Sequence, residues 1–372
     1  MSFSIMCWAG FFAHINCAIA DDTSFTLDVD KYNSPYMGAD WMIAGLRAYQ
    51  AIDDVVASGT VGNDTTCMTL IRGAKWGLEF TLSSFAAVLQ HEIFGHGARA
   101  REFNIPNVGY HIHVFSGATT YPSSSYNALS PNQQAALSAG GVEATSILSQ
   151  QIEINWMRMG SLDSRAATLY LVNSFDESVY AFGLGGNFLH PDNDSSAYLN
   201  AVNAWFGNQA LNEKKLKTDV AWNWLDPMIY MSAYSLLNYI WFGHTSQCFS
   251  FLHIGESRFM PTTRTYLAPY GPEFHLLLNL FTPQEKYIGI NLRYGKTQGK
   301  AAAGLDINVS PISANDCFYL TNKISAWRQP HLLQPGTAAT NTPKWGFADY
   351  IGLYYRLNKG IYVKGEIGYK LS

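Results

Sequence analysis

The stretch at residues 88–97 reads Val-Leu-Gln-His-Glu-Ile-Phe-Gly-His-Gly and lies in an apolar run that begins near Phe80. His91 is followed directly by Glu92, and His96 lies five positions after His91. Imidazole is a good zinc ligand, and a glutamate beside the first ligand can accept a proton from metal-bound water. We therefore predict that His91 and His96 bind zinc and that Glu92 acts as a general base.

The five-residue spacing predicts a distorted helix. In a regular α-helix a step of five residues turns the second histidine about 140° away from the first. Both imidazoles can face one ion only if a turn holds an extra residue, as in a π-bulge. Gly95 and Gly97 flank His96, and we expect Gly95 to absorb the bulge because it has no Cβ. The alternative is a buried helix with two incidental histidines.

Residues 91–96 resemble the expanded H-E-x-x-G-H zinc motif of the dipeptidyl peptidase III family, whereas the usual zincin motif is H-E-x-x-H. The resemblance covers this motif only. It implies a zincin of the gluzincin kind, whose third ligand is a glutamate from a later helix. On this basis Glu143 is the expected third ligand, ahead of Glu102 and Glu153. Many such enzymes carry an aspartate four residues after that glutamate, but Ile147 occupies this position here.

A peptidase also needs a hydrogen-bond donor for the oxyanion that forms during hydrolysis. Residues 108–115 alternate as a strand, which places His111 and His113 on one face. These histidines are reserve metal ligands or substrate contacts in one interpretation and ordinary strand residues in the other. Tyr110, His111 and His113 are all candidate oxyanion donors, and the sequence does not select among them.

Helical periodicity dominates the first two thirds of the chain, and strands follow Pro261. Ser130-Pro131-Asn132-Gln133 is typical of a helix start with a capping box, and Gly140-Gly141 is expected to separate that helix from the next. Lys359-Gly360 indicates a hairpin turn between two late strands. We expect helices at residues 35–56, 65–103, 142–157, 161–182, 195–205, 213–224 and 228–242, and strands at 264–268, 273–281, 286–294, 301–309, 347–357 and 361–370.

These patterns predict an α+β fold. A mainly helical, zincin-like catalytic domain at residues 21–258 would precede an antiparallel β-rich domain at 259–372, built as a sheet or a partial barrel. Hydrophobic residues make up 48% of the 372 residues, which is enough for a sizeable core. The net charge is -4 and the chain has no basic block, so nucleic acid is not an expected partner.

The first 20 residues contain no Lys, Arg, Asp or Glu and end in Ala18-Ile19-Ala20. This pattern indicates a signal peptide at residues 1–20, although the usual positive start is missing; the alternative is an ordinary buried helix. Cleavage would leave Cys67, Cys248 and Cys317, which allow at most one disulfide.

The expected function is that of a zinc metallopeptidase, a hydrolase of peptide or protein substrates. It would be exported from a bacterium and be periplasmic or associated with the outer membrane through its β-region. The alternative function is a non-catalytic, outer-membrane-associated envelope protein whose helical half is a scaffold. The two differ in whether His91, His96 and a carboxylate converge on one point.

Overall fold

The computed structural model describes fourteen stretches of the chain, and all statements below concern them. The described residues are 8–12, 15–19, 23–27, 29–56, 66–113, 117–121, 128–183, 193–206, 209–249, 251–284, 286–313, 318–330, 343–358 and 361–371.

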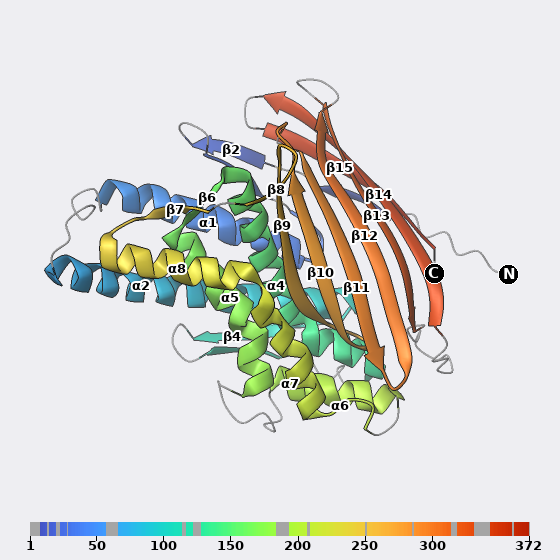
Figure 1. Ribbon diagram of the computed structural model, residues 1–372. Coiled ribbons are helices and arrows are strands. Elements are labelled where there is room, and N and C mark those ends of the chain that lie inside the picture. Colours follow the sequence, from blue (N-terminus) through green and yellow to red (C-terminus); the bar gives the residue numbers. More distant parts are fainter. Residues whose placement is uncertain are drawn as a thin grey trace.

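The described helices lie between residues 35 and 242 and are grouped on one side of a large sheet (Figure 1). A π-helical turn, η2 (Glu92–His96), separates α2 from α3, and a 3-10 turn, η4 (Trp222–Leu225), precedes α8. The α-helices are α1 (Pro35–Val56), α2 (Thr66–His91), α3 (Gly97–Glu102), α4 (Pro131–Met159), α5 (Ser164–Phe182), α6 (Asp194–Phe206), α7 (Glu213–Ala221) and α8 (Pro227–Phe242).

Helix α4 is the centre of the helical half, and it packs against α1, α2, α5, α6, η2 and strand β9. Its start is the expected capping box between Ser130 and Gln133. The expected break at Gly140-Gly141 is wrong, because α4 runs through both glycines. A Cβ at Gly140 would lie 2.9 Å from Cγ of Arg99, and one at Gly141 would lie 2.2 Å from Nε2 of His91. Close packing, which only glycine allows here, outweighs the poor helix propensity of this pair.

The C-terminal third forms one antiparallel sheet in which consecutive strands are neighbours, so the α+β fold class is confirmed. Strand β13 lies within residues where no strand was expected. The Lys359-Gly360 turn lies outside the described residues. The strands are β9 (Ser257–Ala268), β10 (Gly271–Phe281), β11 (Tyr287–Thr297), β12 (Lys300–Ser313), β13 (Phe318–Pro330), β14 (Pro343–Asn358) and β15 (Ile361–Leu371), with β8 (Leu252–Ile254) beside β9 and β1 (Trp8–Phe12) beside β15.

Three small antiparallel pairs accompany this sheet. They are β2 (Ile15–Ile19) with β3 (Thr23–Leu27), β4 (Gly109–His113) with β5 (Gly117–Tyr121), and β6 (Ser161–Asp163) with β7 (Ser246–Cys248). The predicted signal peptide overlaps β1 and β2, and its cleavage point after Ala20 lies outside the described residues. Export therefore stays a prediction, as do the two domain boundaries.

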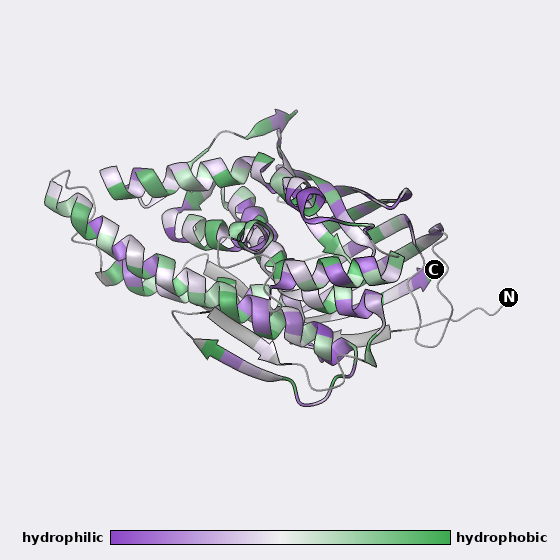
Figure 2. Cartoon of the chain, turned by 90° about the horizontal axis from the view of Figure 1, so that it is seen from below, coloured by the Kyte–Doolittle hydropathy of each residue, from purple (hydrophilic) through white to green (hydrophobic). Residues whose placement is uncertain are grey.

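Two apolar clusters join the helices to the sheet around strands β9–β11. One links α4, α6 and α7 to Leu267 and Tyr270, and the other links α4, α5 and α8 to Phe281 and Tyr287. Hydrophobic and hydrophilic residues alternate along the long helices, as expected for helices with one buried face (Figure 2). Among the described helices, none is both long and apolar enough to cross a membrane.

Candidate metal centre

The predicted helix distortion is present between the two histidines. Residues Glu92–His96 form a π-helical turn between α2 and α3, so the segment holds one residue more than a regular turn. This extra residue brings His91 and His96 to the same face, with ring centroids 4.8 Å apart. Gly95 lies within this turn, as expected, and there is no room for a Cβ at its position. A Cβ at Gly95 would lie 2.6 Å from the Gly140 carbonyl oxygen, so the glycine allows η2 to touch α4.

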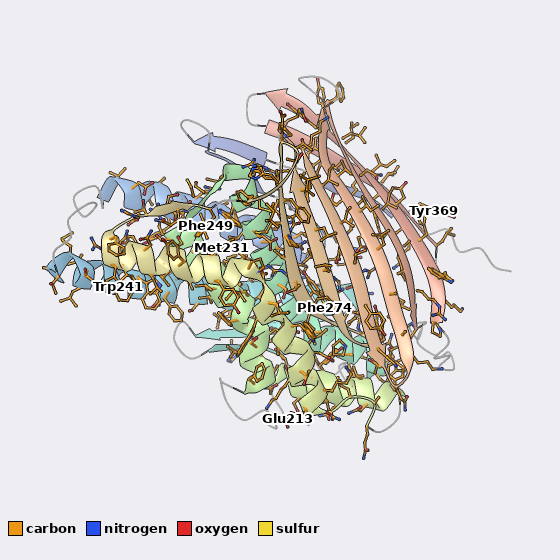
Figure 3. The ribbon with its side chains drawn as sticks, viewed as in Figure 1. Glu213, Met231, Trp241, Phe249, Phe274 and Tyr369 are labelled. Carbon is orange, nitrogen blue, oxygen red and sulfur yellow. The ribbon has the colours of Figure 1, made fainter. Side chains whose placement is uncertain are left out.

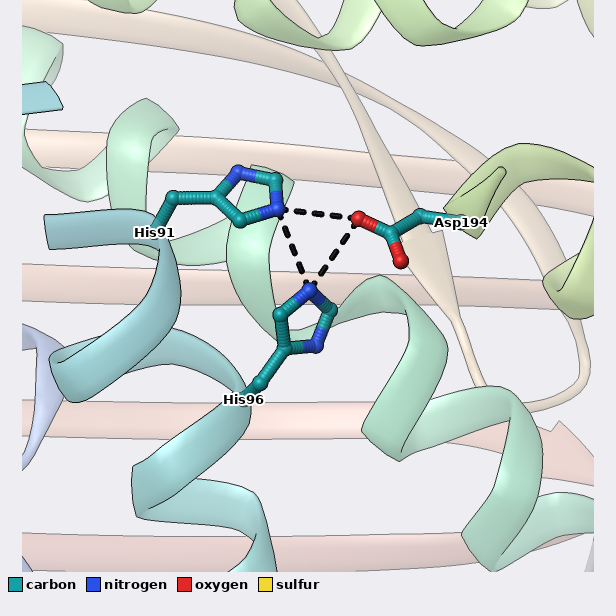
Figure 4. A group of neighbouring side chains, drawn as sticks. All are labelled: His91, His96 and Asp194. Atoms are coloured by element: carbon teal, nitrogen blue, oxygen red, sulfur yellow. Dashed lines mark hydrogen bonds and ion pairs between the residues drawn. The ribbon is translucent and has the colours of Figure 1, made fainter. Parts of the chain in front are cut away.

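Three side chains meet at one point: His91, His96 and Asp194 (Figure 4). The two Nε2 atoms are 3.1 Å apart, and Asp194 Oδ2 lies 2.9 Å from His91 Nε2 and 3.0 Å from His96 Nε2. Ligand atoms around a tetrahedral ion with bonds of about 2.0–2.1 Å are about 3.3 Å apart. Shifts of a few tenths of an ångström would therefore fit such an ion, and the cluster can hold a metal.

The Nδ1 atoms of both histidines, which face away from the cluster, have hydrogen-bond partners of their own. His91 Nδ1 lies 2.8 Å from Asp176 Oδ2, and His96 Nδ1 lies 2.7 Å from the Leu137 carbonyl oxygen. Both partners are acceptors, so each Nδ1 carries a proton and each Nε2 is directed toward Asp194 Oδ2. A proton on Nε2 can satisfy the Asp194 carboxylate, and a metal ion in its place would bind the lone pairs of both Nε2 atoms. A histidine held by a carboxylate on its far nitrogen is typical of metal sites.

The electrostatics of the cluster favour positive charge. Burial lowers the pKa of His91, but Tyr180 and Asp176 raise that pKa more, and the net value lies well above the usual range. Burial likewise lowers the pKa of His96, while Asp194 and, more weakly, Glu92 raise it above the usual range. Burial raises the pKa of Asp194, but the charges of His96 and His91 lower it far below the usual range. The site is therefore built to hold a cation against the Asp194 carboxylate.

Sequence reasoning missed both aspartates of this site. Asp194 lies in the first turn of α6, where the helix dipole favours a negative charge. The preceding Asn193 fixes that turn, because its Oδ1 accepts a hydrogen bond from the Ser196 backbone nitrogen and its Nδ2 donates to the Tyr180 carbonyl oxygen. Asp176 lies on α5 and is held by the Thr145 hydroxyl at 2.9 Å. The acidic residue in the first turn of α6 was the available signal for Asp194; nothing local distinguishes Asp176.

The structure does not bring Glu143 to the cluster. Both of its carboxylate oxygens accept hydrogen bonds from the Arg99 guanidinium, at 2.5–3.2 Å. Glu143 follows Gly141 by two residues on α4, and that step turns its side chain away from the histidines and toward α3. The two other candidates are also elsewhere: Glu102 pairs with Arg99, and Glu153 is buried against Arg264. Asp194 takes the position in the cluster that the family resemblance gave to Glu143.

Glu92 lies beside the cluster and is buried. Its Oε2 accepts a hydrogen bond of 2.6 Å from the Thr120 hydroxyl on β5. Glu92 and His91 also line a cavity of about 390 Å³. This volume falls within the usual range for small-molecule sites, about 300–1,000 Å³. Its other walls are mainly apolar residues of α2, α5 and α8, among them Trp76, Phe80, Leu171, Val172, Phe175 and Leu236.

Of the candidate oxyanion donors, Tyr110 and His111 are not among the residues that form the metal cluster or line the cavity beside it. The Tyr110 hydroxyl accepts a hydrogen bond from Arg101, and His111 is exposed. The side chain of His113 lies outside the described residues. Tyr180, which the sequence did not single out, stacks on the His91 ring at 5.0 Å and lines the cavity.

Comparison with known proteins adds no relative: no family model, no curated protein and no solved structure matches this chain. The geometry of the site therefore carries the functional argument.

Proposed function

We propose that this protein is a zinc-dependent metallopeptidase that hydrolyses peptide bonds in the bacterial envelope. The observation that carries the proposal is the convergence of His91 Nε2, His96 Nε2 and Asp194 Oδ2 beside the buried carboxylate of Glu92. A set of two imidazoles and one carboxylate is typical of catalytic zinc, which keeps its fourth position for water or substrate. A structural zinc site would instead have four protein ligands.

The ligand set suits zinc better than the hard cations. Calcium and magnesium prefer six or more oxygen ligands, whereas this cluster offers two nitrogens and one oxygen. A zinc ion held here would supply a Lewis acid that polarises the scissile carbonyl and lowers the pKa of water. Asp176 and the Leu137 carbonyl would keep the two imidazoles oriented toward it.

Glu92 is the proposed general base. It follows the first ligand directly and lines the same cavity, so a peptide bound there would lie within its reach. Its carboxylate would take a proton from the attacking water and later pass it to the leaving amine. The hydrogen bond from Thr120 would fix the position of this carboxylate.

Tyr180 is the proposed oxyanion donor. It lines the cavity and stacks on a proposed ligand, so its hydroxyl is near the reacting carbonyl. The charge of His91 lowers the pKa of Tyr180, but burial and the surrounding carboxylates raise it above the usual range. The hydroxyl therefore keeps its proton at neutral pH and can donate it in a hydrogen bond.

Glu92→Gln tests this proposal. The amide keeps the size of the side chain but cannot accept the proton, so we expect turnover of a broad peptide library to fall by roughly 10²–10⁴-fold while the bound metal remains. The matched control is Glu102→Gln on the exposed end of α3, which should keep wild-type turnover. Wild-type turnover in Glu92→Gln would show that Glu92 is not the base.

The proposed site of action is the cell envelope, as a periplasmic or outer-membrane-associated enzyme. The support is the apolar start of the chain, which ends in Ala18-Ile19-Ala20. Mass spectrometry of the protein from its native host should give Asp21 as the first residue. An intact Met1 on a cytoplasmic protein would contradict export.

A further inference from the structure

The large sheet has one apolar face, and that face points away from the helices. The strand register aligns its side chains in rows across neighbouring strands. One row runs through Leu278, Ile290, Ile307 and Ile324. The neighbouring row lies two residues further along β11. It runs through Leu276, Leu292, Leu305, Ala326, Phe347 and Leu371.

These side chains are open to the surroundings. Trp345 is 74% exposed and Ile367 is 68% exposed, which are high values for large apolar residues. Tyr369 lies on the side of β15 that is turned away from the helices (Figure 3). Solvated apolar surface of this extent is rare on monomeric soluble proteins and marks an interaction surface.

The opposite face of the same strands is mixed: Phe281 and Tyr287 pack on the helices, and polar residues lie further along the sheet. A cavity of about 490 Å³ lies between this face and the helices, and charged side chains line it. Arg293 contacts Glu273 at 3.8 Å and Asp306 at 3.1 Å. Lys323 and Glu366 line the same cavity. Around this cavity the inward residues are therefore mainly polar, and the outward residues of the same strands are mainly apolar.

This alternation is the reverse of what water requires. An antiparallel sheet with one solvated face normally turns its apolar residues inward and its polar residues outward. Strands that border lipid show the opposite arrangement, because hydrocarbon surrounds their outer face. We propose that the outward face of β10–β15 contacts the acyl chains of a lipid bilayer.

The dimensions of the apolar band agree with this partner. Along β13 the band extends from Leu320, paired with Leu353, to Arg328, paired with Trp345. Those eight steps join nine residues, and a tilted strand needs about 9–11 residues to cross the hydrocarbon region of a bilayer.

Aromatic residues lie at both ends of this band, as in the girdles at membrane boundaries. Tyr294 and Trp345 lie at one end, and Phe318 pairs with Tyr355 at the other. Two polar residues interrupt the band, and they bond to each other: Asn322 Nδ2 donates to Asp349 Oδ1 at 2.8 Å. Lipid is favoured over a second copy of the chain because the aromatic residues mark two boundaries, which a protein partner does not require.

A pair of single-cysteine variants tests which face meets lipid. Ile367→Cys and Glu366→Cys are neighbours on β15 that point to opposite faces, and each is made in the full chain with its native cysteines replaced by serine. The proteins are labelled with an environment-sensitive fluorophore and reconstituted in phosphatidylethanolamine–phosphatidylglycerol vesicles that carry a nitroxide on the acyl chain. We expect the label at position 367 to be quenched at least about twofold more than the label at 366. Equal quenching at positions 366 and 367, or a stable dimer that does not bind vesicles, would overturn the proposal.

Vesicle flotation gives a second test, in which the native cysteines are kept. Ile351 and Ile367 are cross-strand partners, and changing both to lysine should lower the fraction of protein that floats by at least about tenfold. The control is Trp241→Lys on α8, a residue that is 55% exposed but lies on the helical half. Loss of flotation in this control alone would assign docking to the helices instead. His96→Ala should float like the wild type, since the sheet and the metal site are separate.

Discussion

At the scale of single residues, the site combines what the local sequence determines with what only the fold determines. His91, Glu92 and His96 share one short segment, so their spacing alone predicted how they meet. The third member of the cluster, Asp194, lies 98 residues after His96 and reaches it only because α6 packs against α4. Its place in the first turn of α6 was the one local signal, and that signal does not show that Asp194 meets the histidines while Glu143 forms an ion pair with Arg99.

Glu177 makes stability depend on pH in a way that one substitution can isolate. Its side chain is buried, Oε2 accepts a hydrogen bond from Asn223, and burial raises its pKa to about 8 from the ordinary 4.5. The folded state therefore keeps this proton while the unfolded state releases it, so the stabilising effect is complete below pH 4.5 and is lost as the pH rises through about 8.

Glu177→Gln removes this dependence. We expect the variant to gain stability over the wild type between pH 5 and pH 9, by up to about 1.4 kcal/mol for each unit of pKa shift. Urea unfolding at both pH values measures the difference, and Glu213→Gln on the exposed start of α7 is the control. An unchanged difference between variant and wild type at the two pH values would contradict the assignment.

At the scale of elements, the glycines act through packing. The sequence correctly indicated a π-bulge between His91 and His96, because no regular helix could bring both rings to one face. It wrongly indicated a helix break at Gly140-Gly141, because propensity carries no information about the neighbour that needs the space. Strand β13 was missed for a related reason: its inward residues Lys323 and Ser325 face the polar cavity, so the segment lacks the apolar inner face of an ordinary strand.

Gly141→Ala should therefore damage the site without breaking the helix. The new methyl group would lie 2.2 Å from His91 Nε2, so the imidazole must move away from Asp194. We expect metal affinity to fall by at least about tenfold, with helix content by circular dichroism unchanged. Gly77→Ala on α2 is the control, since nothing lies within 4 Å of its Cβ position, and it should bind metal normally and gain up to about 1 kcal/mol of stability. Equal metal affinity in the two variants would count against the packing role of Gly141.

At the scale of the whole molecule, the apolar cavity joins the metal centre to helices α2, α5 and α8. Under the proposed peptidase function, its walls would favour substrates with a large apolar side chain next to the scissile bond. Leu236 lines this cavity, whereas the adjacent Leu237 is exposed. Leu236→Trp should lower kcat/KM for peptides with Phe or Leu in that position by roughly 10–100-fold and spare peptides with Ala. Leu237→Trp should change neither, and a matching loss in both variants would show that the cavity does not select the substrate.

The metal content of the full-length protein tests the central claim most directly. After purification in the presence of zinc and removal of free ions, elemental analysis should give about one zinc per chain for the wild type. His96→Ala and Asp194→Asn should lose this zinc, since each removes a converging ligand atom. Glu143→Gln should keep it, because Glu143 is engaged with Arg99. A wild-type protein without metal, or a Glu143→Gln variant that loses zinc while Asp194→Asn retains it, would contradict the site described here.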